Sequence, residues 1–367
     1  MTLNVDIRKL SEIHDIEPTF ISLYLNIEKD FDDFLNSREQ AIRGALAEKT
    51  RLKNIFYENM QKVRTHLTEN IASLQRKGVR GIAIFHSKPM DFFEAHPIPM
   101  EVENAMIVDS SPYIRPMAKF LEEYEDFGII LLDHNHARIY LVKAGEIAET
   151  ERLHEEIFHH HKKGGFSQMR FQRKRDGELV HFYKDIAEQA TKVFEGVKIR
   201  RLIVAGQSDA KKNFIPYLPK FYQDKIIAVL NIETETPDED VVKDAFPVFF
   251  EKEREEEIAL VEEFMGAVMK GENAAYGLAD VLERTKNGRA ERILINMGFK
   301  SPGYKCEADN VMKLRPGSCD LCGGNLLQVD AVEELVEWAQ QSSAKVEFIA
   351  ENESLETLGG VGAFLRW

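Results

Sequence analysis

Hydrophobic residues recur along the first part of the chain in two rhythms, one typical of helices and one typical of buried strands. Between about Phe31 and Arg76 they return every three or four positions, which places them along one side of a helix. The length of this segment predicts one long helix or a helical hairpin, with Gly44 as its weak point. The stripe consists of Phe56, Met60, Val63, Leu67, Ile71 and Leu74. Runs at 21–26 and 82–85 predict buried strands, Pro89, Pro97 and Pro99 predict loops, and 112–123 predicts a short helix.

Strand and helix patterns alternate through the middle of the chain. Short apolar runs predict strands at 127–133, 137–142, 201–205 and 225–230, the first two joined by a tight turn as a hairpin. Amphipathic spacing predicts a helix over 183–194 and a helical turn over 210–214 that Pro216 stops. Such alternation is typical of an α/β layer with a partly parallel sheet.

The last part of the chain repeats the alternation after a change in charge pattern. An acidic stretch from Glu251 opens a helix, because acids favour the positive end of the helix dipole. Helices are also predicted over 278–284 and 331–340, and strands over 293–296 and 345–349. We therefore predict three consecutive α/β domains. They are an N-terminal domain with the long helical segment (1–124), a middle domain (125–247) and a C-terminal domain (248–367).

Composition narrows the class of protein. The chain has 367 residues, of which 44% are hydrophobic and 30% charged, so it can build packed cores. No apolar run approaches the roughly 20 residues that span a bilayer, and the N-terminus shows no signal-peptide pattern. Three cysteines, all within 306–322, do not make a disulfide framework. We expect a cytoplasmic protein without a membrane anchor.

One basic segment contrasts with a formal net charge of −14. Residues 159–175 contain three histidines and six other cations but no acid; the six are Lys162, Lys163, Arg170, Arg173, Lys174 and Arg175. Lysine and arginine neutralise phosphates, so a local basic segment on an acidic protein indicates a nucleic-acid partner. Gly164 and Gly165 predict a bent tip, after which Met169 to Arg175 begins a helix. The alternative is a basic loop without a function.

Two residue pairs near the C-terminus have the spacing of a zinc knuckle. They are Cys306 with Asp309, and Cys319 with Cys322. Two Cys-x-x-Cys pairs would indicate tetrahedral zinc, and a carboxylate oxygen at Asp309 is a chemically acceptable substitute for the fourth thiolate. The segment predicts either a structural zinc site or a decayed site with free thiols.

These motifs together resemble the class I release-factor and Pelota superfamily of archaea and eukaryotes, especially its divergent prokaryotic relatives, the Balon-like ribosome hibernation factors. Gly164-Gly165-Phe166-Ser167-Gln168-Met169-Arg170-Phe171-Gln172-Arg173 is similar to the release-factor pattern Gly-Gly-Gln-Ser-x-x-Arg-Phe-x-Arg. The sequence of 358–367 resembles the family's ending Gly-Gly-Ile-x-Ala-Ile-Leu-Arg-Tyr. Supporting matches are the cysteine-containing insert and Val204-Ala205-Gly206 with Lys211, Lys212 and Phe214.

The resemblance implies three domains in an extended, tRNA-like arrangement, with a small zinc-ribbon-like insert in the last. It implies a monomer that enters the ribosomal A site, with a translational GTPase of the elongation-factor type as a partner of the C-terminal domains. In release factors, the glutamine of Gly-Gly-Gln helps to position the water that hydrolyses peptidyl-tRNA. Phe166 occupies that position here, and its ring neither donates nor accepts a hydrogen bond. The chain also lacks the Asn-Ile-Lys-Ser and Tyr-x-Cys-x-x-x-Phe motifs that read stop codons.

Two functions are compatible with this pattern. In the first, the protein binds the ribosome without hydrolysis and serves hibernation, protection or rescue. The six cations then pair with rRNA phosphates, Phe166 stacks on a base, and Gly164, Gly165, Ser167 and Gln168 complete the contacting loop. In the second, the protein is a release or rescue factor in which Gln168, or main-chain groups, replace the missing glutamine in peptidyl-tRNA hydrolysis.

Overall fold

The structure is a computed structural model that describes residues 5–154, 167–197, 199–207, 209–306, 308–309 and 311–367; over 167–174 it describes the backbone alone. The chain forms two compact units. The middle unit contains Tyr124–Glu256, and the terminal unit contains Leu3–Glu123 together with Glu257–Trp367. Within the described ranges, every helix is too short or too polar to span a bilayer.

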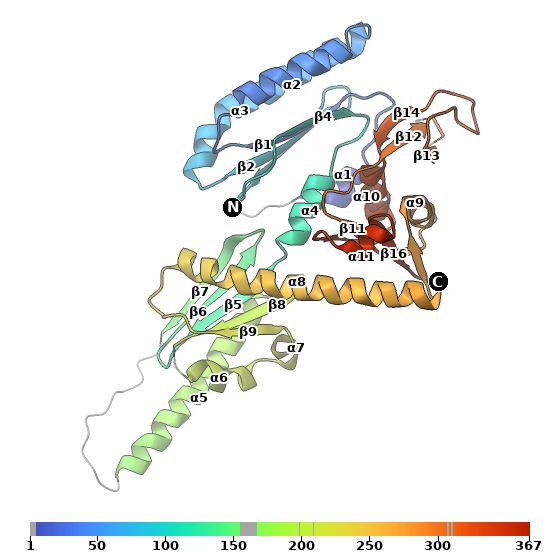
Figure 1. The fold of residues 1–367 in the computed structure, drawn as a ribbon. Helices are drawn as coiled ribbons and strands as arrows, with labels where there is room; N and C mark the ends of the chain where they lie inside the picture. Colours follow the sequence, from blue (N-terminus) through green and yellow to red (C-terminus); the bar gives the residue numbers. More distant parts are fainter. Residues whose placement is uncertain (1–4, 155–166, 198, 208, 307, 310) are drawn as a thin grey trace. The chain divides into compact units, whose positions relative to one another are not determined.

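The N-terminal part of the terminal unit is built on a four-stranded antiparallel sheet with the order β3-β2-β1-β4 (Figure 1). Its strands are β1 (Phe20–Asn26), β2 (Gly81–Ser87), β3 (Phe92–Ile98) and β4 (Ala105–Asp109). The helices of this part are α1 (Ile7–Ser11), α2 (Asp32–Ala45), α3 (Thr50–Arg76) and α4 (Arg115–Glu123). Helices α2 and α3 form the predicted helical hairpin. Most of the predicted α3 stripe, including Phe56, Met60 and Val63, is buried against β1 and β2.

The prediction of a loop at Pro97 is wrong. Pro97 lies within β3 and pairs with Ile82 of β2. Proline has no N–H to donate to a sheet, but β3 is an edge strand, where one side of the strand needs no partner. The edge position therefore accommodates a residue that the sequence pattern treats as a strand breaker.

The C-terminal part of the terminal unit contains two sheets. The first has the order β10-β16-β11-β15 and consists of β10 (Ala274–Tyr276), β11 (Ala290–Asn296), β15 (Lys345–Ile349) and β16 (Val361–Leu365). The second has the order β13-β12-β14 and consists of β12 (Pro302–Cys306), β13 (Val311–Lys313) and β14 (Leu327–Asp330). The helices are α9 (Leu278–Lys286), α10 (Ala331–Gln341) and α11 (Glu353–Thr357). The predictions of α9, α10, β11 and β15 are confirmed, and the second sheet forms the predicted small insert.

Helix α10 joins the two parts of the terminal unit. The backbone N–H of Ile114 donates to Glu333 (2.5 Å), and the hydroxyl of Ser111 donates to Glu337 (2.6 Å). The guanidinium of Arg115 donates to Asp330 (3.1 Å) and to the carbonyl oxygen of Phe299 (2.5 Å). The first and last predicted domains thus pack as one compact unit, while the division of the chain into three domains stays a prediction.

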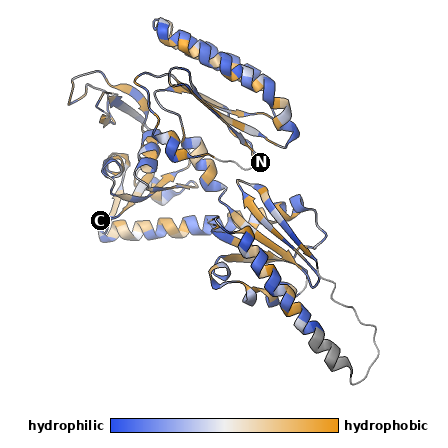
Figure 2. Cartoon of the chain, turned by 180° about the vertical axis from the view of Figure 1, so that it is seen from behind, coloured by the Kyte–Doolittle hydropathy of each residue, from blue (hydrophilic) through white to orange (hydrophobic). Residues whose placement is uncertain are grey.

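The middle unit is a five-stranded mixed sheet with helices on both faces. The strand order is β7-β6-β5-β8-β9, with β5, β8 and β9 parallel and β5, β6 and β7 antiparallel. The strands are β5 (Phe127–Leu132), β6 (His136–Lys143), β7 (Glu146–His154), β8 (Arg201–Ala205) and β9 (Ile226–Leu230). All except the edge strand β7 are largely hydrophobic (Figure 2). The helices are α5 (Ser167–Val193), α6 (Ala210–Phe214), the 3-10 turn η1 (Ile215–Tyr217), α7 (Lys220–Gln223) and α8 (Asp238–Lys270), whose residues from Glu257 onward belong to the terminal unit. The predicted hairpin and partly parallel sheet are confirmed.

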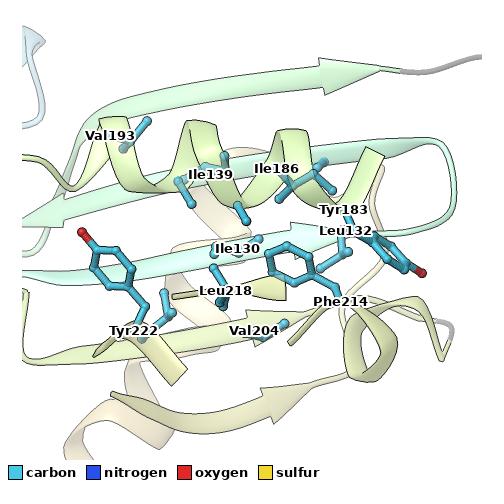
Figure 3. Packing of buried hydrophobic residues seen from close by; sticks show 14 of the residues in the cluster. Ile130, Leu132, Ile139, Tyr183, Ile186, Val193, Val204, Phe214, Leu218 and Tyr222 are labelled. Atoms are coloured by element: carbon cyan, nitrogen blue, oxygen red, sulfur yellow. The ribbon is translucent and has the colours of Figure 1, made fainter. Parts of the chain in front are cut away.

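The two long helices cover opposite faces of this sheet. Tyr183, Ile186 and Val193 of α5 pack on Ile130, Ile139 and Val204 (Figure 3). On the other face, Val241, Ala245 and Phe249 of α8 pack on Phe127 and Ile129. Helix α8 begins at Asp238, not at Glu251 as predicted, and it contains Pro247. Proline cannot donate an intrahelical hydrogen bond. The helix continues past Pro247 because the packing of its first turns against the sheet offsets that loss.

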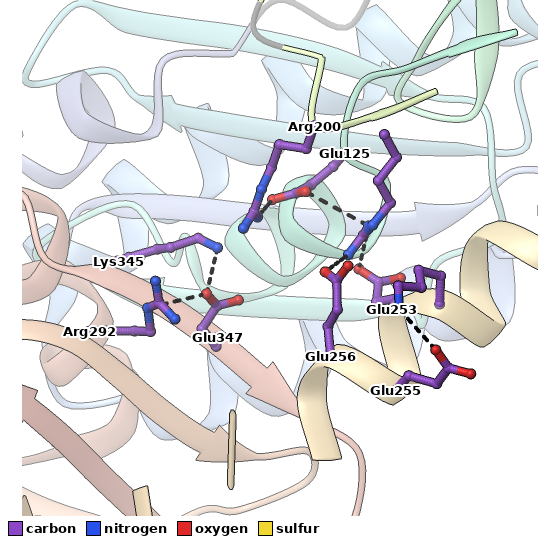
Figure 4. A network of polar contacts seen from close by, with 10 residues as sticks. Glu125, Arg200, Glu253, Glu255, Glu256, Arg292, Lys345 and Glu347 are labelled. Carbon is purple, nitrogen blue, oxygen red and sulfur yellow. Dashed lines mark hydrogen bonds and ion pairs between the residues drawn. The ribbon is translucent and has the colours of Figure 1, made fainter. Parts of the chain in front are cut away.

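Ion pairs supplement the packing within each unit (Figure 4). In the middle unit, Arg201 at the start of β8 is buried, contacts Glu256 of α8 (2.8 Å) and lies 4.8 Å from the ring centre of Phe249. In the terminal unit, Glu347 pairs with Lys345 (2.5 Å) and Arg292 (3.7 Å). These contacts tie neighbouring elements together by charge as well as by apolar packing.

Candidate functional site

The basic segment is attached to the rigid part of the middle unit at both ends. Strand β7 ends at His154, and α5 begins at Ser167. The predicted site residues Lys162, Lys163, Gly164, Gly165 and Phe166 lie outside the described residues. The backbone of Ser167, Gln168, Arg170, Arg173 and Lys174 belongs to the first turns of α5, and the side chain of Arg175 is exposed. A helix over Met169 to Arg175 is thus confirmed, and it starts two residues earlier.

Helix α5 packs on the sheet through its second half. Phe182, Ile186 and Phe194, which follows the helix, are almost fully buried, whereas Arg175, Asp176 and Gly177 are exposed. At 1.5 Å per residue, the turns before Gly177 extend about 15 Å along the helix axis from this packed region, and Figure 1 shows α5 projecting from the sheet. The positive end of the helix dipole adds to the cations at this terminus.

The predicted supporting residues of the middle unit are structural. The ammonium group of Lys211 is buried and donates to the carbonyl oxygen of Gly206 and to the side chain of Asn231. Burial lowers the pKa of Lys211. Phe214 lies in the core, and a Cβ on Gly206 would overlap the carbonyl oxygen of Leu132. These residues hold β5, β8 and α6 together beneath the site, while Lys212 is exposed.

The second candidate site is a cluster of four ligand-type side chains in the three-stranded sheet. One ligand atom each from Cys306, Asp309, Cys319 and Cys322 lies within 4.8 Å of all the others. The sulfurs of Cys306 and Cys322 are 3.5 Å apart, and Asp309 Oδ2 lies 3.5 Å from the sulfur of Cys306 and 3.2 Å from that of Cys319. Zinc–sulfur bonds of about 2.3 Å in a tetrahedron require sulfur–sulfur edges of about 3.8 Å. The separations of 3.2–3.5 Å are near these edges, so the four side chains could together hold a tetrahedral metal ion.

Backbone groups support the same interpretation of the cluster. The N–H groups of Leu321 and Gly324 lie 3.4 Å from the sulfurs of Cys319 and Cys322. The N–H of Gly323 bonds the carbonyl oxygen of Cys319 and closes the turn. N–H groups directed at sulfur stabilise thiolates, which are the form that binds metal. Cys306 and Cys319 are buried and Cys322 is exposed, so the cluster could hold a metal at the surface of the insert.

Sequence reasoning missed three buried carboxylates on α10. Glu333, Glu334 and Glu337 are each at most 6% exposed. Burial, followed by the charge of Glu334, raises the pKa of Glu337 to about 8. Burial also raises the pKa of Glu333 and of Glu334, although the ammonium group of Lys305, 2.6 Å from Glu334, opposes the shift there. In the sequence these residues look like the solvent face of a helix, and nothing local distinguishes them.

Comparison with known proteins finds similarity to release factors in two parts of the chain. Residues 112–249 match the model of the bacterial archaeo-eukaryotic release factor family 10, and residues 255–367 match the model of eRF1 domain 3. The peptide chain release factor subunit 1 of Methanopyrus kandleri is 35% identical over 204 residues, which are 54% of this chain and about half (49%) of that protein. Its counterpart from Archaeoglobus fulgidus is 24% identical over 98% of this chain and 96% of its own length.

A solved structure, the Pelota protein of Archaeoglobus fulgidus, aligns with 78% of this chain and 79% of its own, at 15% identity and a TM-score of 0.36. The two family models together span nearly all of residues 112–367, and the relative from Archaeoglobus fulgidus extends the match over the remainder. Both models and both relatives are archaeo-eukaryotic release factors, the class of protein that this chain resembles over nearly its whole length. Within that class, its middle part matches the bacterial family 10.

Proposed function

We propose that this protein binds the ribosomal A site and directs residues 159–175 toward the peptidyl-transferase centre, in hibernation, protection or rescue of the ribosome. The observation that carries the proposal is Phe166, which stands where release factors have the water-positioning glutamine. A phenyl ring cannot orient water, but it stacks on a nucleobase. The substitution therefore favours binding over hydrolysis.

The support for this proposal is the combination of charge and anchoring in the middle unit. Four of the six cations, Arg170, Arg173, Lys174 and Arg175, belong to the first turns of α5, whose second half packs in the core. Because α5 is anchored in the core, less conformational entropy is lost when its cations contact phosphates. Lys162, Lys163, Gly164, Gly165, Ser167 and Gln168 complete the proposed contact surface.

Ribosome co-sedimentation of matched variants tests the binding. Replacing Arg170, Arg173, Lys174 and Arg175 with alanine should weaken ribosome binding. The slope of the logarithm of the binding constant against the logarithm of the salt concentration should become less negative by about 0.7–0.9 for each lost phosphate contact. A control variant removes the same net charge from four exposed lysines of the same unit, Lys184, Lys192, Lys220 and Lys243. Equal binding of both variants at physiological salt would contradict the assignment.

A second function, peptidyl-tRNA hydrolysis, is favoured by the intact Gly164-Gly165 pair and the Ser-x-x-Arg-Phe-x-Arg pattern that follows. In that case Gln168 would replace the missing glutamine. Ribosome complexes with a stop or a sense codon in the A site distinguish the two functions. We expect binding without release of the peptide. Hydrolysis that Gln168→Ala abolishes and Gln172→Ala spares would establish the second function, and its dependence on the stop codon would separate termination from rescue.

The cysteine cluster supports the proposal of one structural zinc ion. Cys306, Asp309, Cys319 and Cys322 would hold it, and the ion would cross-link the ends of β12 to the turn at 319–324. No base lies among these ligands, so we assign the ion no catalytic role. The family resemblance also leads us to propose a GTPase of the elongation-factor type as a partner. Co-purification with that GTPase in its GTP-bound form tests this part of the proposal.

A further inference from the structure

A groove of about 540 Å³ lies in the terminal unit between α9, α10 and β13. Its floor is apolar and is formed by Leu282 of α9, Val311 and Met312 of β13, Leu314, and Trp338 of α10. Cys306 faces Val311 in the ladder between β12 and β13, so one wall of the groove belongs to the same sheet as the cysteine cluster. The groove is therefore built from elements that packing holds in place.

The rim of the groove is positive on a chain of net charge −14. Lys286, Lys313 and Arg315 line it, against one acid, Glu283. The ammonium group of Lys286 lies 5.2 Å from the ring centre of Trp338. That of Lys313 donates to the carbonyl oxygen of Ser318 (2.9 Å) and pairs with Asp320 (2.5 Å), so Lys286 and Arg315 carry the positive charge offered to a ligand. Arg315 is exposed to solvent. Positive charge around an apolar floor is complementary to carboxylates flanking an apolar side chain.

We propose that this groove binds an acidic peptide segment of a partner protein. One aliphatic or aromatic side chain of the segment fills the apolar floor, and its aspartates or glutamates lie beside Lys286 and Arg315. RNA fits less well, because nucleobases bind by stacking on an open aromatic face. Trp338 is only 6% exposed, with Lys286 above its ring. The groove belongs to the terminal unit, so it is separable by mutation from the basic segment of the middle unit, and the inference is independent of the proposed function.

The full-length chain provides its own reporter for this interaction. It has two tryptophans, so a Trp367→Phe background leaves Trp338, which lines the groove itself, as the single tryptophan for selective excitation. The probe is a synthetic peptide of aspartates around a central Leu-Phe pair. Its controls carry asparagine for aspartate or serine for Leu-Phe, and a single-stranded oligouridine serves as the nucleic-acid probe.

We expect the acidic peptide to change Trp338 emission with a salt-sensitive affinity, and both control peptides to bind more weakly. Arg315→Glu should weaken binding about tenfold or more, because it places like charges together at the rim. Lys77→Glu makes the same charge change at an exposed position of the same unit outside the groove, and it should leave binding intact. Unchanged melting of both variants confirms that they are folded.

Three results would overturn the proposal. The first is no saturable response of Trp338 to the acidic peptide. The second is an equal loss of affinity in Arg315→Glu and Lys77→Glu, which would show that affinity depends on the net charge of the protein and not on the groove. The third is oligouridine binding that Arg315→Glu abolishes while the peptide does not bind, which would make the groove a nucleic-acid site.

Discussion

The buried carboxylate of Glu337 makes the stability of the terminal unit depend on pH in a direction that the structure specifies. Its side chain lies on α10 and accepts a hydrogen bond from Ser111, two residues after the end of β4. The charged groups that act on it are Glu334 of its own helix, Asp109 of β4 and Lys305 of β12. Burial is the largest effect, and it raises the pKa of Glu337 from an ordinary value near 4.5 to about 8.

The sign of the effect follows from proton uptake by the two states. Between about pH 4.5 and pH 8 the folded protein keeps a proton on Glu337 that the unfolded chain releases, so the folded state binds more protons and stability falls as the pH rises. Each pKa unit corresponds to about 1.4 kcal/mol. From about pH 5 to about pH 7, this residue should therefore remove roughly 2–3 kcal/mol from the free energy of unfolding.

Replacing Glu337 with glutamine should abolish this loss. Glutamine has nearly the same volume and still accepts a hydrogen bond from Ser111, but it does not titrate. The free energy of unfolding of Glu337→Gln relative to the unmodified protein should therefore rise by roughly 2–3 kcal/mol between about pH 5 and about pH 7. This double difference cancels any constant effect of the amide on packing.

Urea unfolding measures this free energy of unfolding. It is followed by the fluorescence of Trp338, on the same helix, in a Trp367→Phe background. A Glu48→Gln variant, at an exposed position of the same unit, should follow the unmodified protein at every pH. If the stabilities of Glu337→Gln and the unmodified protein run parallel across this range, then Glu337 is not protonated in the folded state and the reasoning is wrong.

Three further perturbations test the framework around the sites. Gly206→Ala should destabilise the middle unit by about 3 kcal/mol, because the new methyl group overlaps the carbonyl oxygen of Leu132, and thermal melting measures the loss. We expect elemental analysis to find one zinc ion per chain, and Cys319→Ser should release it and lower the melting temperature; Asp320→Asn, which breaks only the ion pair of a neighbouring exposed carboxylate with Lys313, should retain the ion. Arg115→Ala should cost the terminal unit about 2 kcal/mol in urea unfolding, since it removes bonds to Asp330 and Phe299, while Arg51→Ala, which breaks an exposed ion pair, should cost less than about 1 kcal/mol.

The secondary structure of long segments could be predicted from the sequence, because one pattern of hydrophobic residues continues along each of them. Helix α3 carries its stripe over several turns, and β11 and β15 are continuous apolar runs. Short strands such as β10 and β13 have three residues each, too few to show an alternation. The start of α8 at Asp238 had a local signal in Pro237 and the acids of its first turn, but Pro247 obscured it.

The C-terminal glycines illustrate a motif whose physical basis appears only in the fold. A Cβ on Gly362 would overlap the ring of Phe264, which packs from α8 onto β16. The sequence shows that this ending resembles a family pattern, and the structure shows that a close approach between helix and strand requires glycine there.

The sequence by itself determined the chemistry of both candidate sites. The cations of 159–175, the substitution at Phe166 and the spacing of Cys306, Asp309, Cys319 and Cys322 are local, so neighbouring positions in the chain suffice to recognise them. Only the tertiary structure decided which carboxylates are buried, what lines the groove beside Trp338, and that the first and last parts of the chain pack together. These features depend on contacts such as that of Ser111 with Glu337, whose partners are 226 positions apart. Burial and charge at such contacts are set by the packing of distant elements, and no local pattern records them.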